Sequence, residues 1–253
     1  MRIAILQPTY LPWLGWFDIV DQVDCLILLD DVAFSKQSWQ QRNRLRTLKG
    51  LEYVSVPVRS AGRSGQKISE VQFVDDRFVG KLERLITGSY ARAPYLKELL
   101  PSFSEVLRKS SASGQLSELN TGLIEWFCKT LGISTPRQLS SKLRVSGKRG
   151  ERVSALCEQV GAREYLSPAG SEVYLLEDLS AFEQRQIEVA LHIYEHPVYR
   201  QTLCPFLPFA STLDLLFNEG PRSLEIIRAG RRVPRILRRP SHSTFREIDH
   251  ENS

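Results

Sequence analysis

The sequence lacks the features that mark membrane proteins, disulfide-stapled proteins and zinc sites. No apolar run approaches the roughly 20 residues that a membrane-spanning helix needs. Four cysteines are present, but no two form a Cys-x-x-Cys pair and most stand in apolar surroundings, so we expect buried free thiols rather than disulfides, zinc ligands or a nucleophile. An early proline makes MRIAILQPTY a strand rather than a signal sequence. These absences predict a soluble, cytoplasmic protein without membrane insertion.

Several catalytic signatures are also missing. The chain has no Gly-x-Ser-x-Gly turn, no arrangement of Ser, His and Asp typical of a hydrolase, and no GxxxxGK[ST] phosphate loop. Its four histidines all lie late in the sequence, and His192 and His196 belong to a segment that alternates like a strand. Zinc ligands four residues apart would need a helix, because only a helix brings such residues onto one face. We therefore expect no zinc, haem or flavin.

The excess of positive charge is concentrated at the end of the chain. The formal net charge is +5, yet residues 230–253 hold six arginines and three acidic residues, which leaves residues 1–229 with only about +2. Prolines and a shortage of apolar residues predict that 230–253 is a disordered basic tail, able to bind RNA or an acidic surface or to act only as a solubilising extension. Residues 1–229 have an ordinary globular composition, and we expect them to form a single α/β domain.

The most informative stretch runs from Ile3 to Asp31, IAILQPTYLPWLGWFDIVDQVDCLILLDD. An apolar strand, a turn rich in proline and aromatic residues, a short helical pattern and a second apolar strand follow one another, which is the order of a βαβ unit. Gln7 and Tyr10 stand just after the first strand, and Asp30 and Asp31 end the second. Ligands of open α/β sheets bind at the carboxyl ends of strands, so these four residues are our candidates for the catalytic centre. The alternative is that the prolines and rings only plug the top of the sheet.

The sequence pattern of the rest of the domain predicts a parallel sheet with a helical insertion or layer. Strands are expected at 51–60 and 68–74, and helical periodicity fills the region from about 77 to 132. A second βαβ-like passage follows, and two short helices close the domain. In that passage, strands at 138–147, 164–170 and 187–196 surround an amphipathic helix at 148–162.

Two later segments offer groups for binding a substrate. SGKRGER places Lys148 and Arg152 at the start of a helix, where backbone N–H groups and the helix dipole favour phosphate, although a solvated basic turn fits equally well. YLSPAGSEVYL puts Ser167, Gly170 and Tyr174 on a strand-to-turn edge where they could contact substrate.

An earlier basic segment, KQSWQQRNRLR, is a further candidate. Lys36, Arg42 and Asn43 could bind a carboxylate or phosphate, and Trp39 could stack on a base. A surface helix with ordinary charges is the alternative.

Taken in order, the motifs QPTYLPWLGWFD, DDVAF with the later QRNR, the GKRxER passage, YLSPAG and STLDLLFNEG resemble the WbqC-like family of bacterial proteins. The resemblance covers roughly residues 1–230. Members are often found with genes for surface polysaccharides, and attachment of glycine to an amino sugar has been suggested for some. The resemblance therefore implies a small-molecule site that Gln7, Tyr10 and Trp13 shape and in which Trp13 and Gly15 contact the substrate.

The strand, PT turn and WLGW are also similar to the strand, turn and HxGH of adenylyl-transferring enzymes, including pantothenate synthetase. This likeness implies a nucleotide-binding-like (HUP or Rossmann-like) core and activation of a carboxylate by ATP. Trp13 and Trp16 stand where those enzymes have histidines. The departure matters because an indole cannot replace a cation or a general acid.

We therefore expect a transferase or ligase that attaches a small acyl or aminoacyl group to an amine of a nucleotide-linked sugar. ATP and Mg²⁺ are the expected cofactors, with Asp30 or Asp31 as the metal ligand. The partner is a small molecule, a nucleotide or nucleotide sugar. Two alternatives remain open: a nucleic-acid or ribonucleotide binder that uses the basic tail, and an inert sugar-binding or scaffold protein.

Overall fold

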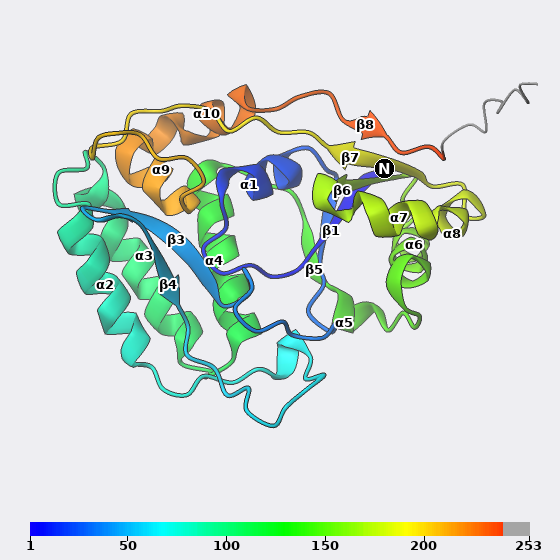
Figure 1. Ribbon diagram of the computed structural model, residues 1–253, viewed down its shortest axis with the longest axis horizontal. Coiled ribbons are helices and arrows are strands. Elements are labelled where there is room, and N and C mark those ends of the chain that lie inside the picture. The colour runs from blue at the N-terminus through cyan, green and yellow to red at the C-terminus, as the bar shows by residue number, and fades with distance from the viewer. Residues whose placement is uncertain (240–253) are drawn as a thin grey trace, which may run out of the picture.

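A six-stranded sheet forms the centre of the molecule (Figure 1). The computed structural model describes residues 1–239. The strand order is β5-β2-β1-β6-β7-β8, and each neighbouring pair is parallel except β7 with β8. The prediction of an α/β fold with a Rossmann-like core is thus confirmed. The strands are β1 (Arg2–Leu6), β2 (Cys25–Leu28), β5 (Arg137–Leu139), β6 (Glu164–Pro168), β7 (Glu188–His192) and β8 (Arg235–Ile236).

The central strand β1 is apolar because both of its faces are covered. Ala4 and Leu6 face the larger core, whereas Ile3 and Ile5 face a smaller core on the other side of the sheet. Side chains of a strand alternate between faces, so a strand buried on both sides reads as a continuous apolar run. β1 and β2 pair in parallel from Ile3 opposite Cys25 to Leu6 opposite Leu28, which confirms the predicted βαβ unit.

Helices cover the two faces and gather at opposite ends of the molecule (Figure 1). The group α2, α3 and α4, with a small antiparallel sheet, lies at one end, and α6 to α8 lie at the other. The predicted helical region at about 77–132 is confirmed by α2 to α4. The helices are α1 (Leu14–Asp21), α2 (Arg77–Ser89), α3 (Leu96–Ser111), α4 (Leu116–Leu131), α5 (Ser140–Leu143), α6 (Arg149–Gln159), α7 (Glu172–Glu177), α8 (Leu179–Glu183), α9 (Thr212–Glu219) and α10 (Ser223–Ala229), and the short 3-10 turns are η1 (Ile68–Glu70), η2 (Ala169–Ser171) and η3 (Gly220–Arg222).

Two stretches between residues 31 and 74 differ from expectation. The basic segment does not form a surface helix: β3 (Arg42–Thr47) pairs antiparallel with β4 (Gly50–Ser55) in a separate sheet. Buried Asn43 and Leu45 alternate with more accessible arginines, a period of two that the density of charge concealed. The strand expected at 68–74 is instead η1 and irregular chain, because Ile68 and Val71 are buried three residues apart, a spacing that suits a 3-10 turn.

The first part of the expected tail is built into the fold. β8 extends the sheet beside β7, and Arg231 forms ion pairs with Asp18 and Asp21 of α1. The arginines at 231–239 therefore serve the domain rather than a separate tail, because acidic residues at distant positions in the sequence balance several of them. The rest of the expected tail, 240–253, lies outside the described residues.

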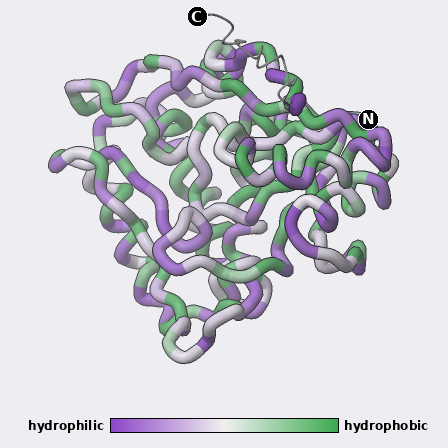
Figure 2. The backbone as a smooth tube through the Cα atoms, turned by 45° about the vertical axis from the view of Figure 1, so that its right-hand side comes forward, coloured by the Kyte–Doolittle hydropathy of each residue, from purple (hydrophilic) through white to green (hydrophobic). Residues whose placement is uncertain are grey.

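Hydropathy changes sign repeatedly along the chain (Figure 2). Within residues 1–239, no helix combines the length and the apolar character needed to cross a bilayer.

Candidate functional site

A cleft runs along the carboxyl edge of the central sheet, beside the ends of β1 and β6. It consists of two adjoining hollows that share Thr9, Trp16 and Trp39. The first, here called the aromatic lobe, has a volume of about 290 Å³ and is also lined by Trp13, Asn43, Arg44 and Phe209. The second, the strand-edge lobe, has a volume of about 370 Å³ and is also lined by Ile5, Leu6, Gln7, Leu29, Ser38, Gln40, Tyr165, Pro168, Ser171 and Tyr174. Among these lining residues, all within the described chain, none is acidic and Arg44 is the one cation.

The turn after β1 is fixed by hydrogen bonds to its own backbone. The side-chain NH₂ of Asn43, on β3, donates to the Tyr10 carbonyl at 3.0 Å. Asn120, buried in α4, donates to the carbonyl groups of Pro8 and Gln40 at 2.9 and 2.7 Å. These bonds satisfy buried carbonyl groups that would otherwise destabilise the turn. Asn43 is therefore mainly a residue that positions the cleft.

Trp13 forms one wall of the aromatic lobe and is held by other rings. Its ring centroid lies 5.6 Å from that of Tyr194, 6.3 Å from that of His196 and 5.9 Å from that of Phe209. Gly15 leaves space for the indole: a Cβ atom at this position would lie 2.4 Å from a Trp13 ring carbon. The glycine of WLGW is thus required by the position of Trp13 and has no evident role in touching a ligand.

Phe209 forms the adjoining wall of the lobe, in contact with Trp13, and His196 holds it there. The Phe209 N–H donates to Nε2 of His196 at 3.1 Å, while Nδ1 of the same ring donates to the Pro197 carbonyl at 2.9 Å. Burial lowers the pKa of His196, which favours the neutral ring that this arrangement needs. Phe209 has a φ of 65°, so its hydrogen bond supports a backbone conformation that non-glycine residues rarely adopt.

Arg44 enters the aromatic lobe from β3. One terminal nitrogen donates to the Phe209 carbonyl at 3.2 Å, and the guanidinium carbon lies 5.7 Å from the centre of the Trp39 ring. The Nε of Arg44 and the Nε1 of Trp16 are both buried without a hydrogen-bond partner among the described residues. The residues that line the aromatic lobe therefore combine aromatic rings with two buried, unpaired N–H donors.

The strand-edge lobe contains hydroxyl and amide groups. Gln40 is buried, and its NH₂ donates to Oε1 of Gln7 at 2.8 Å. This bond fixes the orientation of the Gln7 amide and leaves the Gln7 NH₂ available to a ligand. Tyr174 and Ser171 line the far side, while burial raises the pKa of Tyr165 well above its ordinary value, so this phenol stays protonated.

The acid pair lies at the predicted edge but is already engaged. Asp30 accepts hydrogen bonds from the Ser141 N–H at 3.0 Å and the Ser141 hydroxyl at 2.7 Å, and the Ser140 hydroxyl lies within reach of both acids. Asp31 pairs with Arg152 at 2.5 Å. Burial raises the pKa of Asp31. The hydrogen bonds from Arg152 and Ser140, together with the charge of Arg152, lower this pKa by more than burial raises it, so the net shift is downward. The carboxylates join the end of β2 to α5 and α6, and with their oxygens engaged in this way they do not fit the predicted Mg²⁺ site.

The start of α6 does not form the expected phosphate site either. The Gly150 N–H donates to a carboxylate oxygen of Asp178 at 2.9 Å, so a protein anion already occupies this helix end. Arg152 is committed to Asp31, and Lys148 is exposed outside the cleft. The basic turn is therefore a structural feature of the loop after α5.

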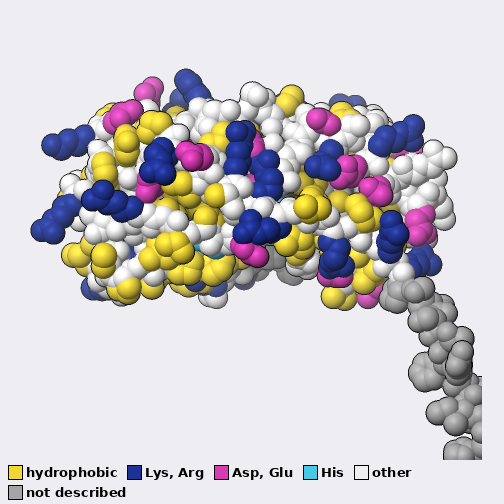
Figure 3. Space-filling model, turned by 90° about the horizontal axis from the view of Figure 1, so that it is seen from above, with side chains coloured by type: hydrophobic (Ala, Val, Ile, Leu, Met, Phe, Trp, Pro, Cys, Tyr) yellow, Lys and Arg dark blue, Asp and Glu magenta, His cyan; other side chains and the backbone are white. Residues whose placement is uncertain are grey.

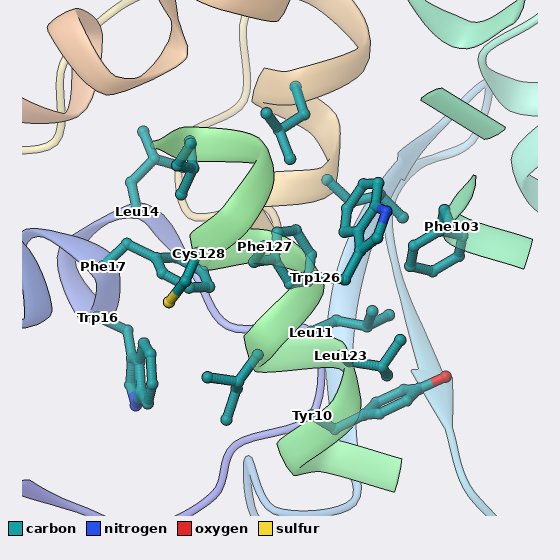
Figure 4. Close-up of a cluster of buried hydrophobic side chains, with 14 of the residues drawn as sticks. Tyr10, Leu11, Leu14, Trp16, Phe17, Phe103, Leu123, Trp126, Phe127 and Cys128 are labelled. Carbon is teal, nitrogen blue, oxygen red and sulfur yellow. The ribbon is translucent and has the colours of Figure 1, made fainter. Parts of the chain in front are cut away.

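Tyr10 belongs to the core rather than to the cleft. Its side chain is buried, and Figure 4 shows its hydroxyl directed away from Trp16. Burial raises the pKa of Tyr10, which removes it as a base near neutral pH.

Four further candidates lie outside the lobes. Arg42 stacks over Tyr53 with its guanidinium carbon 4.5 Å from the ring centre. Lys36 and Gly170 are exposed, and Ser167 is fully buried at the end of β6.

The polar residues of STLDLLFNEG hold a loop. Asp214 accepts from the Tyr199 hydroxyl at 2.5 Å and from the Gln201 amide at 2.9 Å, and Asn218 accepts from the Thr202 N–H at 2.8 Å. Burial raises the pKa of Asp214, and these donors limit that rise. The loop that they fix leads directly to Phe209, so this motif shapes the aromatic lobe from a distance.

Sequence reasoning reached some residues of the cleft and missed others. Trp39, which was predicted to stack on a base, and Arg44, which stands in the same basic segment, both line the cleft. Trp16 was visible in the turn, but its unpaired N–H depends on tertiary packing. Phe209 carries no local signal, because it reaches Trp13 only through the fold.

Comparison with known proteins agrees with the ordered motifs. The WbqC-like protein family matches residues 7–226. A protein of Mycobacterium tuberculosis, described as "Uncharacterized protein Rv1507c", is 33% identical over 228 residues, which cover 90% of this chain and 97% of that protein. No solved structure matches the chain. The cleft described above is the candidate functional site. From these matches, the chain belongs to the WbqC-like protein family.

Proposed function

We propose that this protein transfers a small acyl or aminoacyl group, such as glycyl, to the amine of a nucleotide-linked sugar for surface polysaccharide synthesis. The observation that carries the proposal is the cleft at the carboxyl edge of β1, in which exposed rings adjoin a guanidinium group and a row of amide and hydroxyl groups. Aromatic faces suit sugar rings or bases, and arginine suits phosphate. Open α/β sheets bind ligands at this edge. Family membership is consistent with the proposal and leaves donor and acceptor open.

The proposed reaction needs positioning more than a dedicated nucleophile. The amine nitrogen attacks the carbonyl carbon of an activated carboxylate, the leaving group departs with its bonding electron pair, and the amine gives up a proton to solvent. The free NH₂ of Gln7 could stabilise the oxyanion that develops on the carbonyl, because Gln40 holds this amide in place. Tyr174 and Ser171 would orient the acceptor. ATP is the proposed activating co-substrate.

A direct assay tests this proposal. The protein is incubated with a UDP- or dTDP-linked amino sugar, glycine, ATP and Mg²⁺, and the acylated sugar is detected by mass spectrometry. We expect the unaltered protein to form product. Gln7→Ala should lower the rate of product formation at least about tenfold, because removal of an oxyanion donor typically lowers kcat by this much or more. Lys148→Ala, which changes a residue outside the cleft, should retain activity. Absence of product with every donor, together with no thermal stabilisation by any nucleotide sugar, would overturn the proposal.

One surface feature favours a second candidate, a binder of single-stranded nucleic acid. Trp39 is 49% exposed and Tyr53 is 52% exposed, and their ring centroids lie 6.3 Å apart. The guanidinium group of Arg44 lies over the Trp39 ring, and that of Arg42 lies over the Tyr53 ring. Alternating rings and guanidinium groups are typical of such binding. On the face seen from above, however, basic and acidic side chains are interspersed rather than separated (Figure 3).

Salt-dependent RNA binding distinguishes this candidate. It should fall when Arg42 and Tyr53 are replaced, and removal of residues 240–253 should isolate the contribution of the terminal segment. Truncation at Gly230 is unsuitable, since it would also remove β8 and the ion pairs of Arg231. Nucleotide-sugar binding without either transfer or RNA binding would leave the sugar-binding scaffold.

A further inference from the structure

We propose that the aromatic lobe is a phosphate subsite, in which the N–H groups of Trp16 and Arg44 bind oxygens of a phosphate carried by a sugar or nucleoside. The assignment deepens the proposed function, on which it rests for the identity of the whole ligand. It places the phosphates of the nucleotide sugar in the aromatic lobe and leaves the strand-edge lobe for the amine-bearing end.

The first observation is the environment of Trp16. This side chain is only 6% exposed and lines both lobes, yet its Nε1 has no hydrogen-bond partner among residues 1–239. Figure 4 shows the Trp16 indole on one side of α4 and the Trp126 and Phe103 rings on the other. Buried N–H groups are nearly always satisfied in native proteins, so a donor beside a cavity calls for an acceptor from a ligand or from the solvent that a ligand replaces.

Trp126 provides the contrast within the same chain. It is equally buried at 6% exposure, but its Nε1 donates to the Ser102 hydroxyl at 3.1 Å. The tryptophan of the core is therefore satisfied by the protein, whereas the tryptophan of the cleft is left with its donor free.

The second observation is the state of Arg44. Its Nε is buried without a partner among residues 1–239, and a terminal nitrogen donates to the neutral carbonyl of Phe209. No carboxylate of the described residues lines the lobe. A partly buried cation without an anionic neighbour is electrostatically incomplete, and a bound oxyanion would supply the missing charge. Asn43 does not compete for this role, because its amide is used by the Tyr10 carbonyl and the Arg44 N–H.

The class of ligand follows from charge and shape. A metal ion is disfavoured by the guanidinium and by the lack of acidic ligands. A neutral sugar could stack on Trp13, Trp39 or Phe209 but would leave Arg44 without an anion. A phosphate attached to a ring uses both kinds of group at once, since the oxygens reach the two N–H donors and the ring contacts the aromatic walls.

Tryptophan fluorescence offers a direct test, because three of the four tryptophans line the aromatic lobe. The protein is titrated with UDP, dTDP, inorganic pyrophosphate and glucose, and thermal stability is measured in parallel. We expect UDP or dTDP to bind, pyrophosphate to bind more weakly because it lacks the ring, and glucose to bind weakest.

Matched variants assign the binding to the two donors. Trp16→Phe keeps an aromatic ring but removes the N–H, and Arg44→Gln removes the charge; each should raise the Kd for UDP or dTDP about tenfold or more, as expected for a hydrogen bond to a charged group. Trp126→Phe and Arg42→Gln, which alter the same residue types outside the lobe, should change that Kd less than about twofold. Both Trp16→Phe and Trp126→Phe shorten a buried ring, so each should lower the melting temperature of the ligand-free protein by a few degrees, and every Kd is measured well below both transitions.

The subsite and the proposed transfer fail in different ways. If the variants bind nucleotide as the unaltered protein does, or if glucose binds as tightly as UDP and dTDP, the subsite is wrong even where acylated sugar is formed. If nucleotide binding depends on both residues but no acylated product appears, the transferase proposal fails and the subsite stands. If no nucleotide or pyrophosphate binds the unaltered protein, the subsite is overturned.

Discussion

Replacing Asp30 tests whether the acid pair is structural or metal-binding. Asp30 is 3% exposed and accepts bonds from Ser140 and Ser141, which join the end of β2 to the start of α5. Asp30→Ala would leave the Ser141 N–H and hydroxyl without their anionic partner. A hydrogen bond to a charged group contributes about 1.5–3 kcal/mol, but removing the buried charge recovers part of that loss.

We therefore expect Asp30→Ala to lower the free energy of unfolding by about 3 kcal/mol, which lowers the melting temperature by about 6–12 °C in a domain of this size. Asp30→Asn should lose less, because its amide can keep some of the same bonds. Glu188→Ala, at an exposed position at the start of β7, is the control and should change stability by less than about 0.5 kcal/mol.

The measurement is thermal and urea unfolding, each with Mg²⁺ and with EDTA. A structural role predicts the same loss of stability in both solutions. If EDTA destabilised the unaltered protein and abolished its difference from Asp30→Ala, the acid pair would hold a metal and our reading of its hydrogen bonds would be wrong.

Three further predictions concern two residues that shape the walls of the cleft and Arg231, near the end of the described chain. Gly15→Ala should displace Trp13 and lower the free energy of unfolding by about 1–2 kcal/mol, since overpacking against the indole outweighs the gain in helix propensity. An unchanged melting temperature together with unchanged tryptophan fluorescence would contradict this prediction. Burial lowers the pKa of His196 in the folded protein, so the unfolded chain takes up a proton first as pH falls below about 6.5. The contribution of neutral His196 to stability is therefore complete above that pH and is lost as the pH falls to the folded-state pKa. His196→Gln should remove this part of the pH dependence in unfolding experiments, and an identical pH profile would refute the assignment. Arg231→Ala should lower the free energy of unfolding in urea by about 2–4 kcal/mol, because it leaves the fully buried carboxylate of Asp18 without one of its partners. A loss below about 0.5 kcal/mol would show that the ion pairs of Arg231 contribute little.

Local pattern was sufficient where neighbouring residues decide the structure. The apolar run in β1 and the helical periodicity of 77–132 were read correctly because burial repeats at short intervals. The location of Asp30 and Asp31 at the carboxyl edge of the sheet was also correct, since parallel strands end on the same side. Their role was not readable, because Ser140 and Arg152 approach them from more than a hundred positions away.

The cleft shows the same division. Gln7 and Trp13 could be proposed from the turn that contains them, and both line the cleft. Tyr10 stands between them in sequence but turns into the core, because successive residues of a turn need not face the same way. Phe209 could not be proposed, since only the complete fold brings it within 5.9 Å of the Trp13 ring.

That contact between Trp13 and Phe209 has a consequence for synthesis of the protein. The two walls of the aromatic lobe come from nearly opposite ends of the domain and are joined by backbone bonds such as that from the Thr212 N–H to the Pro12 carbonyl. During translation, a nascent chain can form the early βαβ unit, but its ligand pocket stays open on one side until residue 212 has left the ribosome. Closing so long a loop is entropically unfavourable until the intervening sheet has formed. Ligand binding would therefore report that the chain has been made and folded at least as far as residue 212.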